Sequence, residues 1–127
     1  MKEAYVSFET AKLLKEKGFD ERTLYHYTNC DKLQHNIVYN QYKNSEMLNA
    51  YSAPTHQMAC AWLREVHKVL IVIDAYHADH WEGYIDSFEI SIYSHASTII
   101  VPNEIAHHTD YEDAVEVAIK YCLENLI

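Results

Sequence analysis

Four residues with metal-binding side chains lie close together in the middle of the chain: Asp74, His77, Asp79 and His80. Imidazole nitrogens and carboxylate oxygens are common ligands of divalent metal ions, which can activate water for hydrolysis. The spacing matches no established metal motif such as H-E-x-x-H, and polar hairpin loops often contain two histidines. A metal-dependent hydrolase using His77, Asp79 and His80 is therefore the alternative function. We assign no catalytic, cofactor-binding or metal-binding residue.

The remaining histidines give weaker candidates. His107 and His108 stand near Asp110 and form a second possible metal site without a recognised spacing. His56 and His67 share one face of a predicted helix. At 1.5 Å per residue they stand roughly 16 Å apart, which is too far to bind one ion.

The three cysteines do not indicate nucleophilic catalysis. Cys30, Cys60 and Cys122 are odd in number and far apart, and two of them fall within predicted helices on or beside apolar faces. We interpret them as reduced core residues, and exclude a disulfide framework or a zinc site. The chain contains two glycines, so it has no glycine-rich phosphate loop.

The negative charge is concentrated in the second half of the chain. Residues 1–50 contain seven basic and seven acidic residues, whereas residues 51–127 contain three basic and twelve acidic ones. A surface of this charge repels phosphate backbones and disfavours direct binding of nucleic acid. It could attract a cation or a basic region of another protein.

The stretch 53–74 predicts one helix followed almost directly by one strand. Met58, Trp62 and Val66 recur at helical spacing and form its apolar stripe. Residues 69–73 are all apolar and mostly β-branched. Continuous apolarity predicts a strand that is covered on both faces and central in its sheet.

The first part of the chain predicts a helix and a hairpin. Ser7 is the expected N-cap of a helix over 8–17, and Gly18 suits the left-handed position at its end. Residues 24–28 and 35–42 are rich in β-formers, and their polarity predicts an edge hairpin.

The last part predicts further strands and a helix. Residues 88–93 alternate in polarity and are expected to pair with 69–75, and 98–101 add a short strand. Thr109 and Glu112 match a capping box, which begins the last helix. Glu116 and Lys120 stand at the spacing of an ion pair along that helix.

The element order α-β-β-α-β-β-(β)-α predicts an α+β fold, with an antiparallel sheet of four or five strands and three helices. At 127 residues, the chain is expected to form a single domain, 1–127. No apolar run approaches the ~20 residues of a membrane span, and the first residues do not resemble a signal peptide. We therefore expect a cytoplasmic protein without membrane contact.

Two segments resemble a known group of proteins. APTHQMACAWLREVHKVLIVI and the terminal TDYEDAVEVAIKYCLENLI resemble small proteins carried by phages and prophages of Bacteroides-type gut bacteria. The Pro-Thr start, the Trp-Leu-Arg-Glu centre and the Tyr-Glu-x-Ala-x-Glu-x-Ala opening carry this likeness. The resemblance implies a small cytosolic α+β protein of mobile-element origin with no assigned function or functional residues.

These observations favour a non-enzymatic protein-interaction module that acts through an acidic surface. The acidic stretch 69–119 would bind an unknown, basic protein partner, and a homo-oligomer is compatible with the sequence.

Overall fold

The computed structural model describes residues 3–28, 33–35, 42–76 and 87–127. Helices and short strands follow one another largely in the predicted order. The elements are α1 (Phe8–Glu16), β1 (Tyr25–Tyr27), β2 (Leu33–His35), the 3-10 turn η1 (Asn44–Glu46), β3 (Tyr51–Ser52), α2 (His56–His67), β4 (Val69–Tyr76), β5 (Ser87–Ser94), β6 (Ser97–Ile99), α3 (Asn103–Ala106), β7 (His107–His108) and α4 (Tyr111–Asn125).

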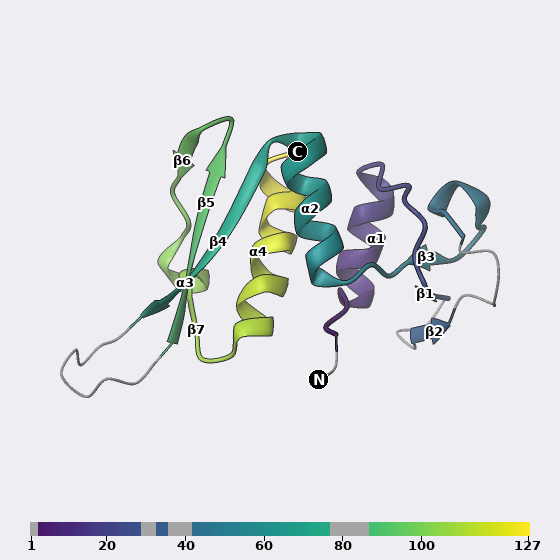
Figure 1. The fold of residues 1–127 in the computed structure, drawn as a ribbon, viewed down its shortest axis with the longest axis horizontal. Coiled ribbons are helices and arrows are strands. Elements are labelled where there is room, and N and C mark those ends of the chain that lie inside the picture. Colours follow the sequence, from purple (N-terminus) through teal and green to yellow (C-terminus); the bar gives the residue numbers. More distant parts are fainter. Residues whose placement is uncertain (1–2, 29–32, 36–41, 77–86) are drawn as a thin grey trace.

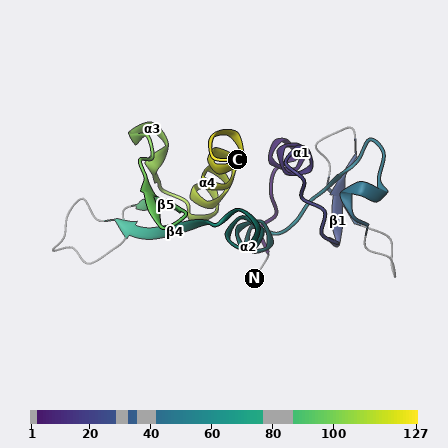
Figure 2. The same ribbon diagram turned by 90° about the horizontal axis from the view of Figure 1, so that it is seen from above.

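Two antiparallel sheets lie at opposite ends of the molecule, with helices α1, α2 and α4 between them (Figure 1 and, from above, Figure 2). The smaller sheet has the strand order β2-β1-β3, and the larger has the order β4-β5-β6 with β7 also paired to β5. This arrangement confirms the predicted α+β class. The strands are divided between two sheets instead of one, and the short helix α3 adds to the three expected helices.

The hairpin in the smaller sheet is present, but its second strand, β2, begins two residues before the predicted 35–42. Tyr25 lies opposite His35 and Tyr27 opposite Leu33. Most of the expected second strand, 35–42, falls outside the described residues. The predicted edge position is wrong for β1, because β3 pairs with its other side.

The ladder between β4 and β5 forms the main part of the larger sheet. Residues directly opposite each other in an antiparallel ladder point to the same face. Ile71 lies opposite Ile92, and Ile73 lies opposite Ile90. Ile90 and Ile92 belong to the hydrophobic core, and the partly buried Ile71 and Ile73 pack against it. Helix α4 packs against both strands.

The prediction that β4 is central and covered on both faces is wrong. Within the described residues, β4 pairs only with β5 and forms the edge of the sheet. Leu70 is 42% exposed and lies opposite the exposed Tyr93. Leu70 and Val72 are the residues that make the apolar run continuous, although they lie on the face opposite to the core isoleucines.

Helix α1 begins and ends as predicted. The Ser7 side chain caps it by accepting a hydrogen bond from the Thr10 N–H. Gly18 has a φ of +96°, and the Phe19 N–H donates to the Leu14 carbonyl at 2.9 Å. This Schellman ending places Phe19 back against the helix that it follows.

The caps of the other long helices are also formed by side chains. Thr55 caps α2 and accepts a hydrogen bond from the Met58 N–H. Asp110 caps α4 and accepts from the Asp113 N–H. The predicted cap at Thr109 is therefore wrong by one residue. An aspartate at this position adds a negative charge at the positive end of the helix dipole.

A single residue joins α2 to β4. Lys68 adopts the left-handed conformation, with φ 59° and ψ 34°, and its N–H donates to the Leu63 carbonyl. Its own carbonyl accepts a hydrogen bond from the His95 N–H at 3.0 Å. The end of the helix is thereby bonded directly into the larger sheet.

This last bond also determines how the backbone groups of β4 are directed. Bonded and non-bonded pairs alternate along an antiparallel ladder. Because Lys68 and His95 form a bonded pair, the even-numbered residues of β4 bond to β5. Ile71 and Ile73 consequently direct their N–H and C=O groups toward the open edge, away from β5.

The buried face of α2 consists of Ala59, Trp62 and Leu63. The Trp62 ring packs edge-on against Phe19, with 5.5 Å between ring centroids. The predicted stripe is therefore wrong at its two ends, because Met58 is 36% exposed and Val66 56% exposed.

Truncating Trp62 tests this core. Trp62 is only 7% exposed, so Trp62→Ala should lower the free energy of unfolding by about 3–5 kcal/mol. Urea titration of both proteins measures the difference. Val66→Ala on the same helix is the control, and a loss no larger than the control's would contradict the burial of Trp62.

Hydrogen exchange tests the orientation of the β4 edge. The amide hydrogens of Ile71 and Ile73 should exchange faster than those of Leu70 and Val72, because only the latter pair donates to β5. Residue-resolved exchange followed by NMR measures the four rates. Equal protection of all four amides would show that the odd-numbered groups have a partner within the chain.

Candidate functional site

The residues proposed for a metal-dependent hydrolase are not brought together in the described part of the structure. His77, Asp79 and His80 lie outside the described residues. Asp74 is exposed on β4 and stands opposite Glu89 in the ladder. The sequence prediction for this loop therefore stays a prediction.

The residues of the second possible metal site, His107, His108 and Asp110, each make a separate contact. His107 Nε2 lies 3.9 Å from the Glu89 carboxylate. His108 Nε2 lies 2.7 Å from the Ile105 carbonyl, and Asp110 serves as the cap of α4. Among residues 3–28, 33–35, 42–76 and 87–127, no three histidine, cysteine or acidic side chains are grouped so that they could hold a metal ion.

The two described cysteines are free thiols with little tendency to ionise. Burial raises the pKa of Cys60 to about 11, although the nearby Arg64 cation opposes this effect. Burial also raises the pKa of Cys122 to about 12. A thiol needs a lowered pKa to be an effective nucleophile near neutral pH, so neither cysteine is activated.

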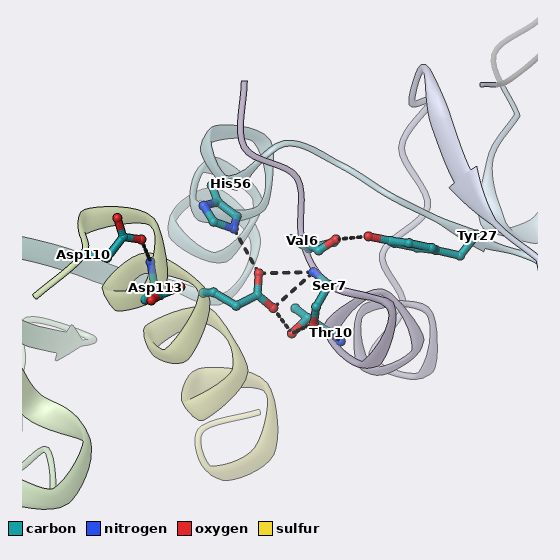
Figure 3. A network of polar contacts seen from close by, with 8 residues as sticks. Val6, Ser7, Thr10, Tyr27, His56, Asp110 and Asp113 are labelled. Atoms are coloured by element: carbon teal, nitrogen blue, oxygen red, sulfur yellow. Dashed lines mark hydrogen bonds and ion pairs between the residues drawn. The ribbon is translucent and has the colours of Figure 1, made fainter. Parts of the chain in front are cut away.

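A partly buried carboxylate joins three helices near the centre of the molecule. Glu116 of α4 lies between the first residues of α1 and α2. Its Oε1 is 2.9 Å from His56 Nε2, and its Oε2 accepts a hydrogen bond from the Thr10 hydroxyl. The backbone N–H of Ser7 is 3.2 Å from both oxygens. Figure 3 shows His56, Ser7 and Thr10 pointing toward this carboxylate.

The surroundings of Glu116 keep it ionised. Burial raises its pKa, but the hydrogen bonds from His56, Thr10 and Ser7 outweigh burial and hold the pKa at about 2. The carboxylate also lies at the N-terminal ends of α1 and α2, where the helix dipoles favour negative charge. The sequence predicted a pair between Glu116 and Lys120. That expectation is wrong, since Lys120 instead lies 3.9 Å from Glu9.

A cleft with a volume of about 720 Å³ lies next to this carboxylate, between α2, β4 and the start of α4. Its apolar walls include Ala61 of α2, Ile71 and Ile73 of β4, and Val115 of α4. Such a cleft can bury apolar side chains of a ligand. In Figure 1, α2 and β4 meet where the helix ends and the strand begins, and they separate toward their other ends, with α4 behind them.

The two ends of the cleft carry opposite charges. Glu3 and Glu112 line one end, beside His56. Two contacts hold His56 at this end of the cleft. Its backbone N–H donates to the Ala4 carbonyl, and its ring contacts the Glu116 carboxylate. Arg64 lines the other end and follows His56 by eight residues, or about 12 Å along the helix.

A second cleft of about 530 Å³ lies on the other side of α2. Met58, Trp62 and Val66 line it together with Phe19, which explains why the two ends of the predicted stripe are exposed. Charged side chains of both signs also line this cleft: Glu21, Arg22, Lys43 and Glu65.

Replacing Glu116 by glutamine tests the contribution of this carboxylate. A group whose folded pKa is lowered stabilises the fold above its unfolded pKa, here 4.5, and this contribution is lost as the pH falls toward about 2. Glu116→Gln should lower the free energy of unfolding at neutral pH by about 2 kcal/mol, since it removes charge-assisted hydrogen bonds.

The same substitution should also flatten the dependence of stability on pH in the acidic range. Urea titrations at pH values from about 7 down to about 2 measure both effects. The exposed Glu124→Gln is the control and should change stability by no more than about 0.5 kcal/mol. An unchanged pH dependence in Glu116→Gln would contradict the ionised state of this carboxylate.

Within the described part of the chain, none of the helices has both the length and the apolarity needed to cross a membrane. No protein-family model, curated protein or solved structure matches the sequence or the fold.

Proposed function

We propose that the protein is a non-enzymatic protein-interaction module, and that the cleft between α2, β4 and α4 binds a segment of its partner. The observation that carries this proposal is a cleft of about 720 Å³ with apolar walls and with Glu3 and Glu112 at one end. Apolar walls favour burial of a partner's apolar side chains, and the carboxylates favour a basic side chain beside them.

The charges around the cleft support a basic contact in the partner. Asp110 and Asp113 are exposed next to Glu112 at the start of α4. The second half of the chain has twelve acidic and three basic residues, which disfavours a phosphate-rich ligand. In this proposal, the Glu112 end of the cleft is the centre of the acidic surface predicted over 69–119.

Mobile-element origin and a cytoplasmic location belong to the same proposal, and they rest on the sequence resemblance. The alternative, a metal-dependent hydrolase using His77, Asp79 and His80, stays a prediction because its residues fall outside the described part of the chain.

Selection of peptides tests the proposed function. A displayed library of random seven-residue peptides is selected against the protein, and the enriched peptides should contain lysine or arginine together with apolar residues. Glu3→Gln combined with Glu112→Gln should weaken their binding about three- to tenfold, because each exposed ion pair contributes up to about 1 kcal/mol. Fluorescence anisotropy of labelled peptides gives the dissociation constants.

Two matched controls distinguish binding in the cleft from general effects of charge and of side-chain size. Glu104→Gln combined with Glu124→Gln removes the same charge from exposed positions outside the cleft and should leave binding unchanged. Gln57→Trp fills the cleft from α2 and should abolish binding, whereas Val66→Trp on the other side of α2 should not. Peptides that bind Gln57→Trp and the parent equally would refute the proposal.

A further inference from the structure

The edge of β4 lies along the cleft. The side chains of Ile71 and Ile73 line its wall, and the N–H and C=O groups of the same two residues are directed away from β5. Among the residues that the structure describes, no strand pairs with this edge. An unpaired edge beside a groove can accept a further strand from another chain. Its backbone would bond to the edge while alternate side chains enter the groove.

The cleft has features that select the side chains of such a strand. The apolar positions lie in the middle, at Ile71 and Ile73, while Glu3 and Glu112 lie at one end and Arg64 at the other. Alternate side chains of an extended strand face the same way, so two apolar side chains in the middle and one charged side chain at each end require a segment of seven residues. A segment of this length with a basic and an acidic end would match both charges.

Resting on the function proposed above, we infer that the partner segment binds as an extended strand added to the open edge of β4. It runs antiparallel to β4, because antiparallel pairing is the more stable arrangement per residue and matches the existing ladder. A basic side chain lies at Glu3 and Glu112, apolar side chains face Ile71 and Ile73, and an acidic side chain lies at Arg64.

The charge of the chain favours a foreign segment over a second copy. Each copy has a formal net charge of −9, and the cleft lies in the half with three basic and twelve acidic residues. Pairing two such edges would bring these acidic halves together, which is unfavourable. A segment from a basic partner avoids this repulsion.

A synthetic peptide tests the inference. The probe is acetyl-Lys-Thr-Val-Thr-Val-Thr-Glu-amide, whose valines are placed opposite Ile73 and Ile71 and whose lysine lies at the Glu112 end. Calorimetric titration measures its binding. Exchanging the terminal lysine and glutamate should weaken binding about three- to tenfold, since both end charges are then opposed. Tighter binding of the exchanged peptide would overturn the antiparallel orientation.

Backbone methylation separates strand addition from simple occupation of the cleft. N-methylation of the two valines removes the N–H groups that would donate to β4, and should weaken binding at least tenfold. N-methylation of the second and third threonines, whose N–H groups point away from β4, is the matched control and should have a much smaller effect. Equal binding of both methylated peptides would overturn strand addition, while sensitivity to Gln57→Trp would still support the proposed function.

Two further measurements complete the test. On addition of the probe, the amides of Ile71 and Ile73 should become protected from hydrogen exchange, while those of Leu70 and Val72 should change little. Sedimentation without peptide should show a monomer. A dimer in which Ile71 and Ile73 are already protected would assign the edge to a second copy and overturn the inference. Failure of the unmethylated probe to bind would overturn it as well, whereas the peptide selection decides the proposed function separately.

Discussion

The partly buried carboxylate of Glu116 is the interaction on which the arrangement of the helices depends. It lies on α4, and its ligands come from Ser7 and Thr10, more than a hundred residues earlier, and from the first residue of α2. An ionised group that is partly removed from water is stable only when hydrogen bonds replace its lost hydration. The three helices must therefore keep the positions that supply those bonds.

This requirement links the core to the cleft. His56 contacts the carboxylate and also lines one end of the cleft, so the same side chain helps to hold α2 in place and shapes the binding surface. Lys68 fixes the other end of α2 to β4. With both ends of α2 held, the cleft has a defined width before any ligand enters, which reduces the entropy lost on binding.

Local signals in the sequence were sufficient to predict the helices. Contacts between residues that are distant in sequence could not be predicted from such signals. Ser7, Gly18 and the helical spacing around Trp62 predicted elements that the structure contains, because caps and stripes depend on neighbouring residues. The edge position of β4 depends on which strands pair beyond it, and apolar content does not report this. The contact between Glu116 and His56 spans sixty residues, and a local pairing rule favoured Lys120 instead. The proposed cleft has no signature in any one segment, since three separate elements form it.

The single-residue connection at Lys68 also determines which face of β4 is buried. A shift of one residue in a strand moves every side chain to the opposite face. In β4 such a shift would place Leu70 and Val72 inside and the isoleucines outside, so both orientations would bury branched apolar side chains. The sequence of β4 alone therefore does not decide which of its two faces is buried. The buried face of β4 is decided by the rigid joint to α2 and by the alternation of Ile90 and Ile92 with Glu89 and Ser91 in β5. Insertion of one residue after Lys68 would consequently leave the composition of β4 and the alternation of β5 intact, while removing one of the two constraints that orient β4.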